Sequence, residues 1–518
     1  MPNTKKLLSI TNLKKYFPVA KTSIFQKNTL YVRANEDITI DIYEGETLGI
    51  VGESGCGKST FGRVLLQLYP QTAGCTLYYG TTLDRLSPSY VEDTIVHHEK
   101  YRRKLKKSTE KYEELHKKVE EAGGEDAADF YLLQSEHLAK GEMETDVSNL
   151  VKILGGFYPC EDKKGIELLH KQYEACKKRN EAAEKVRLHQ VASEHFDQEY
   201  QEADPDKKAR LEKKRADARE KLSALQKDEA AAQAQVDKIT AELDALRASY
   251  ANDEQFQHYE GLRDNGVDLA RLKYAEMRKL RKDLQIIFQD PYSSLNPRFT
   301  VGQIIEEGLV THHFFRHGSA RMREYIVETM EKCGLQEYML HRFPHQFSGG
   351  QRQRICIARA LAVQPKFVVC DECVSALDVS IQSQIINLLQ ELKEKQNLTY
   401  LFISHDLSVV KFISDRIAVM YLGRMVELAP AEEIYNHPLH PYSQSLLSAV
   451  PLPDPKAARA NKRIVLTGDI PSPLNAPSGC PFRTRCRYAK DACAESMPEF
   501  KEVEKGHFVA CHRVKEIN

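Results

Sequence analysis

A glycine-rich stretch has the residue types and spacing of a phosphate-binding loop. In GETLGIVGESGCGKSTFGRVLL, Gly52, Gly57, Lys58 and Ser59 follow the order G-x-x-x-x-G-K-S, between an apolar strand-like run and a helix-like run. Small residues let backbone N–H groups turn inward around phosphates, and the following helix N-terminus favours anions. We expect Lys58 to reach the β- and γ-phosphates and the Ser59 hydroxyl to ligate Mg²⁺. The loop residues are Gly52, Glu53, Ser54, Gly55, Cys56, Gly57, Lys58, Ser59 and Thr60.

Two acidic residues follow a second apolar run. The stretch PKFVVCDE ends in Asp371 and Glu372. An aspartate at a strand end can hold Mg²⁺, and a carboxylate beside it can orient and deprotonate an attacking water. A buried strand that simply ends at two solvated acids is the structural alternative. Combined with the phosphate loop, the pair predicts a site that hydrolyses ATP.

Two further segments could complete such a site. In FSGGQRQRICIARAL, the glycine-rich turn Ser348, Gly349, Gly350 and Gln351 opens a helix and offers a second anion site. In YLFISHD, His405 ends another apolar strand. A single histidine at a strand end is more often structural, so its interpretation depends on the other motifs.

The order of the motifs resembles the ATP-binding-cassette (ABC) ATPase family: phosphate loop, Gln289 in IIFQDP, SGGQ, the two acids, SALD, then histidine. The resemblance implies a P-loop α/β fold in which Gln289 senses Mg²⁺ and a transmembrane partner. It implies that Ser348–Gln351 closes over ATP held by an opposite subunit, that Glu372 is the general base, and that His405 contacts the γ-phosphate. A functional dimer is therefore expected.

Several positions near the nucleotide need separate interpretation. In LSITNLKKYFPV, the resemblance places Phe17 against adenine, with Tyr16 as the alternative. Phe347 stands where the family more often has Leu, and Cys373 where many relatives carry Pro; hydrolysis should survive both changes. Cys56 inside the phosphate loop is interpreted as a small filler. The alternative is thiol reactivity, because the surrounding N–H dipoles would stabilise a thiolate.

Longer stretches resemble one branch of the family. IIFQDPYSSLNPRFTVGQIIEEGL and DECVSALDVSIQSQIINLL look like the ATPase subunits of oligopeptide and dipeptide importers, and the F-type partner of the usual D/F pair is the better match. The resemblance covers residues 1–87 and 274–518. It implies a second ATPase subunit in a heterodimer, two integral membrane permease subunits and an extracytoplasmic peptide-binding protein. Nickel importers use very similar ATPases, so the cargo stays open.

Four of the twelve cysteines are grouped near the end of the sequence. Cys480, Cys486, Cys493 and Cys511 are separated by five, six and seventeen residues in a Pro/Gly-rich region. Four thiolates suit a tetrahedral zinc ion or an iron–sulfur cluster, and the spacing alone does not choose. The resemblance favours a [4Fe–4S] cluster with a structural or redox-sensing role. His507 and His512 are expected at the surface, where either could replace a ligand.

A long segment has the pattern of a coiled coil. Between Lys207 and Tyr250 there is no Pro or Gly, and two mostly apolar rows repeat at 3 and 4 spacing. The rows are Leu211, Ala218, Leu225, Ala232, Ile239, Leu246 and Arg215, Leu222, Glu229, Val236, Leu243, Tyr250. A similar seam runs through residues 99–124. We expect these two helices to pair antiparallel across a less regular middle, residues 127–205.

The resemblance also divides the chain. Joining Ser87 directly to Tyr274 restores a family-like sequence, which makes residues 88–273 an insertion. The expected parts are 1–87 and 274–435 (the two halves of the ABC ATPase), 88–273 (a helical coiled-coil hairpin) and 436–518 (a small Cys-rich extension). The hairpin could pack on itself and the ATPase, dock another protein, or, less in keeping with its mixed charges, contact nucleic acid.

Composition excludes some classes. Lys+Arg and Asp+Glu both number 74, so there is no basic bias of the kind nucleic-acid binders usually show. The sequence has no apolar run near the ~20 residues that span a bilayer, and MPNTKKLLSITNL lacks a signal-peptide core. We expect a peripheral protein on the cytoplasmic face of a membrane. A DNA-organising ABC ATPase is the alternative class, but in those families the coil follows the glutamine, whereas here it precedes Gln289.

Overall fold

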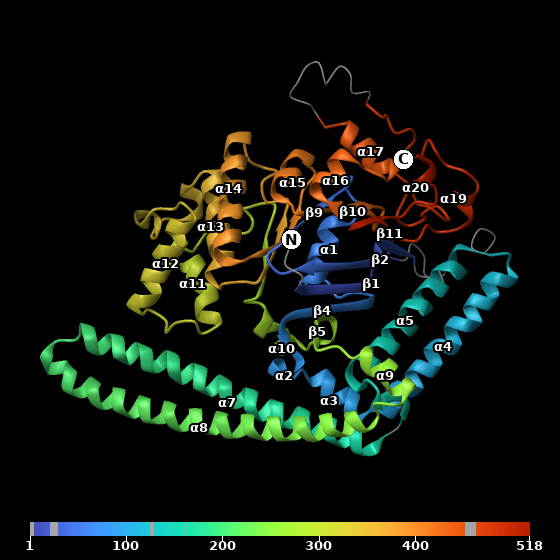
Figure 1. Cartoon of the computed structure of the whole chain (residues 1–518). Coiled ribbons are helices and arrows are strands. Elements are labelled where there is room, and N and C mark those ends of the chain that lie inside the picture. Colours follow the sequence, from blue (N-terminus) through green and yellow to red (C-terminus); the bar gives the residue numbers. More distant parts are fainter. Residues whose placement is uncertain (1–4, 21–29, 125–128, 161, 451–462, 518) are drawn as a thin grey trace.

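Two β-sheets form the centre of the molecule (Figure 1). The computed structural model describes residues 5–20, 30–124, 129–160, 162–450 and 463–517. The smaller sheet is antiparallel, with the strand order β2 (Tyr31–Tyr43), β1 (Lys6–Pro18), β4 (Ala73–Thr82) and β5 (Gly266–Asp268). The larger sheet has the order β11 (Lys501–Glu504), β12 (His507–Val509), β10 (Arg424–Pro430), β9 (Arg416–Tyr421), β3 (Thr47–Val51), β8 (Thr399–Ile403), β7 (Phe367–Asp371) and β6 (Leu284–Ile287).

The middle of the larger sheet is parallel and buried. Strands β3, β7 and β8 are buried at every position, as expected where both faces of a parallel sheet are covered. This burial explains why their sequences are continuous apolar runs. The strands pair in parallel, so their carboxyl ends meet at one edge, where the phosphate loop, the two acids and His405 follow them. Helix α1 (Lys58–Leu65) begins directly after the loop.

A group of helices lies to one side of this sheet (Figure 1). It comprises α11 (Val301–Thr311), α12 (Ala320–Lys332), α13 (Gly349–Ala362) and α14 (Val379–Gln396). Their apolar faces share one core with the sheet, including Ile305, Met330 and Ile355. Helix α15 (Leu407–Ile413) lies between β8 and β9, α16 (Ala431–Asn436) and α17 (Pro441–Ser448) follow β10, and α10 (Tyr274–Leu280) precedes β6. Short 3₁₀ turns cover Leu269–Arg271, Glu337–Met339 and Pro344–Gln346.

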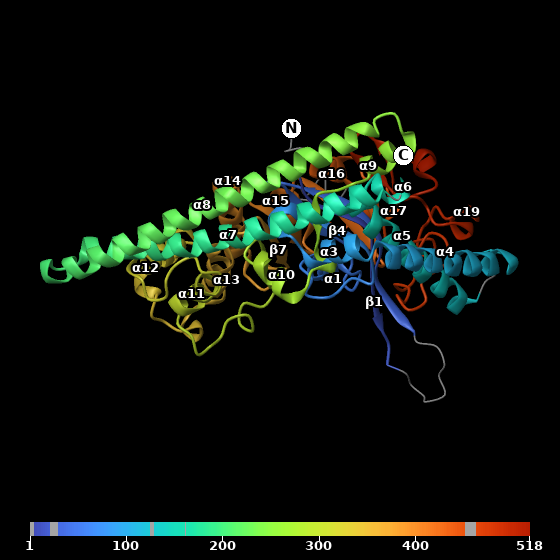
Figure 2. The same cartoon turned by 90° about the horizontal axis from the view of Figure 1, so that it is seen from below.

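The segment between β4 and β5 is almost wholly helical. Its helices are α2 (Leu83–Leu86), α3 (Ser89–Val96), α4 (His98–Glu121), α5 (Phe130–Leu154), α6 (Phe157–Cys160), α7 (Lys163–Glu202), α8 (Pro205–Ser249) and α9 (Glu254–Gly261). The expectation of a less regular middle is wrong, because α5 and α7 are 25 and 40 residues long. The expected pairing is wrong as well: α4 packs on α5, and α7 packs on α8 (Figures 1 and 2).

Cross-helix contacts define the hairpin of α7 and α8. Gln172 donates to Thr240 at 2.9 Å and Arg179 to Gln233 at 3.2 Å, while Arg215 meets Asp197 near the other end. As one residue number rises its partner's falls, so the helices are antiparallel. The residues of both predicted apolar rows in α8 are buried or half-buried. Asp162 caps α7 by accepting from the Lys164 N–H, and Pro205 occupies the first turn of α8.

The helical segment between β4 and β5 leaves and re-enters the rest of the fold at neighbouring points. Strand β4 pairs with β5, placing Thr82 opposite Gly266. The Glu276 carboxylate accepts from the Ser89 N–H at 2.7 Å and from the Lys273 N–H at 2.8 Å. The two ends of this helical segment therefore meet in space.

The C-terminal region continues the larger sheet. Strand β12 pairs with β10, and helices α19 (Ala492–Glu495) and α20 (Val514–Ile517) lie beside them. Across the part of the chain that the structure describes, none of the helices has the length and apolarity needed to cross a membrane.

Candidate functional site

The phosphate loop joins β3 to α1 in a backbone path that requires glycine. Gly52 has φ 153° and Gly57 φ 101°. A Cβ at Gly57 would lie 2.1 Å from the Ala34 carbonyl oxygen, and one at Gly52 would lie 2.2 Å from that of Met420. The Lys58 ammonium, which is buried, donates to the carbonyls of Gly52 and Glu53 at 2.8 and 3.0 Å. The loop thus holds its own lysine where a phosphate could take over those contacts.

Two of the three residues predicted at the Mg²⁺ site, Ser59 and Asp371, meet, whereas the third, Gln289, contacts Glu372. Ser59 Oγ donates to Asp371 Oδ1 at 2.5 Å, although the residues lie 312 positions apart in the chain. Asp371 is buried, and Arg63 Nη2 lies 3.2 Å from its other oxygen. A hydroxyl and a carboxylate are oxygen ligands of the kind Mg²⁺ prefers, and Mg²⁺ sites use one or two carboxylates together with substrate phosphates. The pair therefore fits a Mg²⁺ ion delivered with a nucleotide. Arg63 carries no motif that would have identified it from the sequence.

Glu372 lies between Gln289 and His405. Gln289 Nε2 donates to Glu372 Oε2 at 3.0 Å, and His405 Nδ1 lies 3.5 Å from the same oxygen. The backbone of Glu372 has φ 50°, and its N–H donates to the Ile403 carbonyl at the end of β8. The left-handed turn ends β7 and carries the carboxylate out of the sheet. Gln289, Glu372 and His405, which come from three separate motifs, therefore lie together. They are next to the Ser59–Asp371 pair because Glu372 directly follows Asp371.

The second glycine-rich turn lies elsewhere. Ser348 caps α13: its N–H donates to Gln351 Oε1 at 3.1 Å and its hydroxyl accepts from the Gln351 N–H. Ser348 and Gly349 are exposed, and α13 is well separated from α1 (Figure 1). Phe347, the departure from the family pattern, is buried as a Leu would be. Within one chain this turn therefore does not join the phosphate loop.

The structure distinguishes the two candidate aromatics. Tyr16 is buried, and its hydroxyl donates to Glu36. Phe17 is half-buried; its ring centroid lies 5.5 Å from that of Tyr69, edge to face, and 4.6 Å from Lys15 Nζ. Because Tyr16 faces the interior, Phe17 is the residue with a ring surface available for a base.

Cys56 is buried beneath the phosphate loop. Its Sγ lies 3.9 Å from Lys58 Nζ, yet burial raises the pKa of the thiol above its usual value. This finding goes against a stabilised thiolate and favours the small-filler interpretation.

The C-terminal region is fixed directly to the phosphate loop. Arg485 donates two hydrogen bonds to the Glu53 carboxylate, at 2.7 and 3.0 Å, and the Glu53 N–H donates to the Tyr442 hydroxyl at 2.9 Å. Sequence reasoning missed Arg485 and Tyr442. Neither residue lies in a motif that would mark it, and each contacts Glu53 from a distant part of the chain.

The four clustered cysteines line one small cavity of about 20 Å³. Burial, followed by the neighbouring thiols of Cys511, Cys493 and Cys486, raises the pKa of Cys480 to about 12. Burial raises the pKa of the Cys486 thiol above its usual value, and the nearby Arg513 and Arg487 offset part of that rise. Over the described ranges, the His, Cys, Asp and Glu side chains form no group of three or more already arranged to hold a metal ion. The thiols are neighbours, but they are not drawn together as ligands.

The two histidines near the last cysteine differ. The expectation that His507 is a surface residue is wrong, because it is buried and its Nε2 lies 2.7 Å from Glu427 Oε1. Strand β12 carries it into the sheet beside β10. His512 is exposed, and its Nε2 contacts the Ser496 carbonyl at 2.8 Å. Glu427 therefore already occupies one nitrogen of His507.

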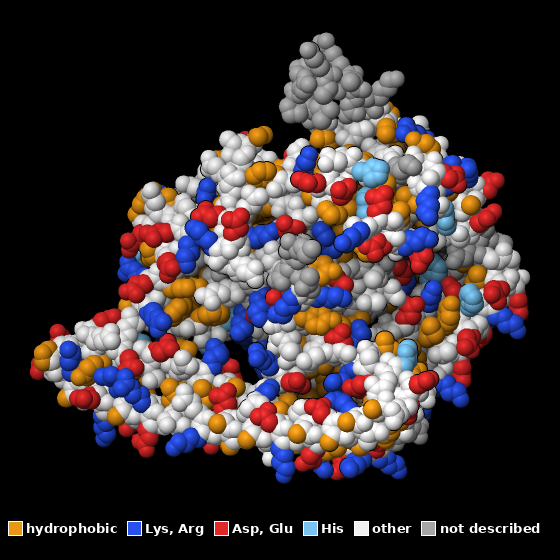
Figure 3. Space-filling model, in the orientation of Figure 1, with side chains coloured by type: hydrophobic (Ala, Val, Ile, Leu, Met, Phe, Trp, Pro, Cys, Tyr) orange, Lys and Arg blue, Asp and Glu red, His pale blue; other side chains and the backbone are white. Residues whose placement is uncertain are grey.

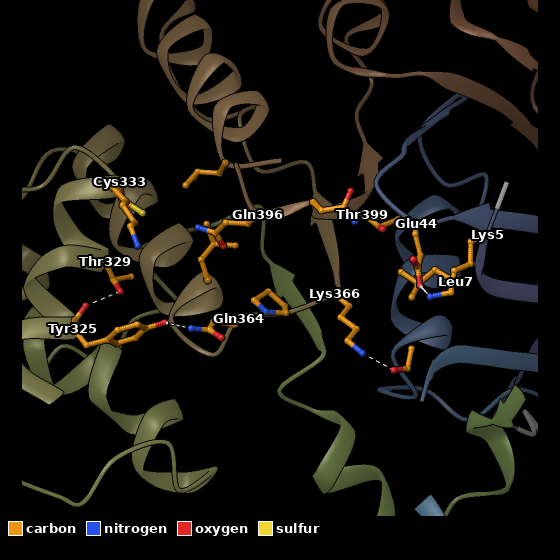
Figure 4. Close-up of a pocket in the computed structure, with 16 residues that line it drawn as sticks. Lys5, Leu7, Glu44, Tyr325, Thr329, Cys333, Gln364, Lys366, Gln396 and Thr399 are labelled. Carbon is orange, nitrogen blue, oxygen red and sulfur yellow. Dashed lines mark hydrogen bonds and ion pairs between the residues drawn. The ribbon is translucent and has the colours of Figure 1, made fainter. Parts of the chain in front are cut away.

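A separate pocket of about 580 Å³ lies at the opposite edge of the larger sheet (Figure 4). Lys366 and Thr399, at the starts of β7 and β8, line it together with Tyr325 and Gln364. None of the predicted site residues lies there. The candidate site is the carboxyl edge of the sheet, not this pocket.

A phosphate loop whose serine meets an aspartate, with a carboxylate one residue further on, has the chemistry of a P-loop nucleoside triphosphatase. The chain belongs to the ABC transporter family, because the profile described as "ABC transporter" matches residues 35–246 and 259–375, more than half of its length. A second profile, "Oligopeptide/dipeptide transporter, C-terminal region", matches residues 426–493.

Individual relatives agree. The chain is 54% identical over 248 residues to the oligopeptide transport ATP-binding protein AppF of Bacillus subtilis, covering 48% of this chain and 75% of that protein. It is 52% identical over 249 residues to the oligopeptide transport ATP-binding protein OppF of Salmonella typhimurium, covering 48% and 74%. The resemblance seen in the sequence is confirmed, and the chain is an ATPase of the ABC transporter class.

Proposed function

We propose that the chain is the ATP-binding and ATP-hydrolysing subunit that powers uptake of oligopeptides or dipeptides through an ABC importer. The observation that carries the chemistry is Glu372, held by Gln289 and His405 one residue from the Ser59–Asp371 pair. The peptide cargo is supported by the names of the relatives and by the C-terminal transporter profile. Nickel or another small solute is the second candidate, because the ATPase resemblance alone does not distinguish cargoes.

The site residues would have separate roles in nucleotide binding and in hydrolysis. Phe17 would stack on the base, and the loop from Gly52 to Thr60, with Lys58, would hold the phosphates. Ser59 and Asp371 would hold Mg²⁺, which when bound neutralises charge developing on the phosphate oxygens. Glu372 would accept a proton from the attacking water, which Gln289 and His405 help to position.

The signature turn requires a second subunit. Because Ser348–Gln351 lies away from the phosphate loop of its own chain, we infer that it closes on ATP held by a second ABC ATPase, most simply a different one in a heterodimer. Two integral membrane permease subunits and an extracytoplasmic peptide-binding protein would complete the importer, with this chain peripheral on the cytoplasmic face of the membrane. No nucleic-acid partner is expected.

Native purification tests this proposal. Affinity capture of the full chain from detergent-solubilised membranes should recover two integral membrane proteins and a second ATPase, identified by mass spectrometry. Uptake of a labelled tripeptide and of nickel, compared in cells with and without the chain, then separates the cargoes. ATPase activity that rises with DNA, with no membrane protein recovered, would instead favour a DNA-organising enzyme.

The four-cysteine site is proposed to hold a [4Fe–4S] cluster, with zinc as the alternative. Cys480, Cys486, Cys493 and Cys511 give a set of soft sulfur donors around one cavity, which fits either metal centre. Binding would require the thiols to lose their protons and to draw together. Arg487 and Arg513 would offset part of the resulting negative charge.

Residues 88–273 are proposed as an inserted unit whose α7–α8 pair forms a coiled-coil hairpin. The Glu276 contacts with Ser89 and Lys273 support these boundaries, and the burial of the two apolar rows of α8 supports the seam. By the same division, 1–87 and 274–435 would form the ATPase and 436–518 the extension, although β5, which lies inside 88–273, pairs with β4 of the ATPase.

The hairpin also contacts the ATPase at two places. Asn180 donates to the Asp84 carbonyl at 2.8 Å, whereas further along α7 Arg187 donates to the His313 carbonyl at 3.2 Å and Glu194 pairs with Arg321. Lys, Arg, Asp and Glu are interspersed over the face of the hairpin that Figure 3 shows. These contacts favour a hairpin that packs against the ATPase of its own chain. They disfavour a hairpin that binds nucleic acid.

A further inference from the structure

Helix α7 is attached to the fold beside the end of β4. The Asn180 amide donates to the Asp84 carbonyl and to the Ser87 hydroxyl, both at 2.8 Å. Asp84 lies in α2, which directly follows β4. Tyr78 of β4 and Phe61 of α1 lie in one hydrophobic core. This point of attachment therefore belongs to the part of the fold that holds the phosphate loop.

The same helix contacts a second part of the fold farther along. Arg187 donates to the His313 carbonyl, just after α11, at 3.2 Å, and Arg321 in the first turn of α12 donates to the Glu194 carboxylate at 2.9 Å. Figures 1 and 2 show α7 running past this group of helices. From Asn180 to Glu194 a helix rises about 21 Å, at ~1.5 Å per residue. One continuous helix thus joins the two parts of the ATPase.

Helix α8 supports this part of α7. Arg179 donates to Gln233 at 3.2 Å before the contacts with α11 and α12, and Arg215 donates to Asp197 beyond them. A single helix that is polar on most sides is only marginally stable in water, and packing against α8 keeps α7 helical. The distance between its two points of attachment is therefore fixed by the rise of the helix.

The helices that α7 contacts are bonded to the helix that carries the signature turn. Tyr325 of α12 donates to the Ala362 carbonyl at the end of α13 at 2.9 Å. Arg354 of α13 donates to the Cys333 carbonyl, just after α12, at 2.9 Å. Helix α13 begins at the turn formed by Ser348–Gln351. A shift of α12 is therefore expected to move that turn.

We propose that Arg187 and Glu194 are positioning residues through which the hairpin sets the orientation of the signature turn relative to the phosphate loop; this inference rests on the proposed closure of Ser348–Gln351 on ATP held by a second subunit. The Glu194–Arg321 pair is exposed, and α11 to α13 share a hydrophobic core with the larger sheet. Exposed ion pairs contribute little to stability, so losing the contacts should shift these helices without unfolding them. Hydrolysis by the paired ATPases should then fall, while ATP binding to the phosphate loop of this chain is kept.

Two shortened hairpins test the proposal in the importer assembled with its second ATPase. Replacing residues 184–228 by a short Gly–Ser loop removes Arg187 and Glu194 but keeps Asn180. Replacing residues 198–214 removes only the end of the hairpin and keeps both positioning residues. The long deletion should lower kcat by about 10- to 100-fold, because a displacement of about 1 Å can cost about 100-fold. The ATP affinity of the isolated chain should stay unchanged, and the short deletion should change neither quantity.

Exchanging charges tests one contact without shortening the chain. Glu194→Arg and Arg321→Glu each place like charges together and should lower kcat up to about 5-fold, the upper value for an exposed ion pair. The double variant restores an opposite pair and should recover the original kcat. The KM for ATP and the melting temperature should stay unchanged in all three variants. Glu167→Arg, which breaks an exposed pair with Lys171 within α7, is the matched control and should keep the original kcat.

The outcomes separate this proposal from the proposed function. A long deletion that keeps the original kcat would overturn the positioning role. A short deletion that loses activity would do the same, because it keeps Arg187 and Glu194. Single charge variants that are impaired and not rescued by the double variant would also count against it. If the unaltered chain, assembled with its partners, hydrolyses no ATP, the proposed function itself fails instead.

Discussion

Arg485 and Glu53 form a two-bond ion pair that joins the C-terminal extension to the phosphate loop. Arg485 Nη1 and Nη2 both donate to the Glu53 carboxylate, and both side chains are largely buried. Together with the Tyr442 hydroxyl, which accepts from the Glu53 N–H, Arg485 therefore connects the C-terminal region to the phosphate loop. Any change in that region that moves Arg485 is expected to reach Glu53.

Replacing Arg485 with Ala should loosen the phosphate loop. The change leaves the Glu53 carboxylate half-buried without its partner, which costs about 1.5–3 kcal/mol for hydrogen bonds to a charged group. We expect weaker ATP binding, measured by nucleotide titration, together with faster proteolysis around residue 53. Arg487→Ala, a neighbouring arginine that does not contact Glu53, is the matched control. Equal ATP affinity in both variants would show that the contact is only structural.

Glu372→Gln should preserve ATP binding and nearly abolish turnover. The amide keeps the size of the side chain, so Gln289 can still contact it, but it cannot accept a proton from water. The loss should be about 10²–10⁴-fold. Steady-state hydrolysis must be measured with the partner ATPase silenced by the equivalent change. Normal turnover in that background would rule out Glu372 as the base.

Phe17→Ala should mainly lower ATP affinity, whereas Tyr16→Phe should mainly lower the stability of the fold. Loss of base stacking costs about 1–3 kcal/mol, so Phe17→Ala should weaken ATP binding roughly 5- to 150-fold with little change in thermal stability. Tyr16→Phe removes the hydrogen bond to buried Glu36 and should lower stability by about 1–3 kcal/mol while leaving ATP affinity unchanged. Isothermal titration and thermal melts of both variants decide between the two rings.

The sequence predicted the residues that gather at the carboxyl edge of the sheet better than it predicted the helical segment between β4 and β5. The motifs and the family resemblance they carry singled out Ser59, Asp371, Gln289, Glu372 and His405, and the structure brings these residues together. The sequence could not identify Arg485 or Tyr442, whose contacts with Glu53 span about four hundred residues of chain. Contacts between residues so far apart in the sequence leave no local repeating pattern by which they could be recognised.

The helical segment between β4 and β5 shows a different limit of prediction from sequence. The heptad rows correctly marked the buried side of α8, but they did not show which helix covers it. The charged residues 163–202 have no regular apolar pattern and lie in the stretch predicted to be less regular, yet they form the 40-residue partner helix α7. Its helicity is supported by packing against α8 rather than by a clear apolar stripe of its own.

Excising the insertion should succeed only if β5 is kept. Strand β5 pairs with β4, and Val267 and the following Leu269 are almost fully buried. The Leu83 N–H donates to the Asn265 carbonyl at 3.1 Å, so a short Gly–Ser linker could replace residues 84–264. We expect that variant to melt well above one lacking residues 88–273, because each lost side chain costs about 1.5–3 kcal/mol. If the two deletions are equally stable, β5 does not belong to the ATPase core.

Metal analysis should decide what the four cysteines hold. Full chain purified without oxygen is expected to be brown and to contain about four irons, since the resemblance favours a [4Fe–4S] cluster and four thiols line one cavity. Cys486→Ser should lose the colour and the iron, and because Arg485 is the preceding residue, it should also weaken ATP binding. Cys333→Ser, which changes a buried thiol far from this cavity in the sequence, should keep both the iron and the ATP affinity.

A colourless chain with one zinc would favour the zinc site instead, and a chain with neither metal would leave the cysteines as packing residues. The decisive comparison is whether ATP affinity falls when iron is lost. Such a fall is expected because Arg485, next to Cys486, contacts Glu53 of the phosphate loop.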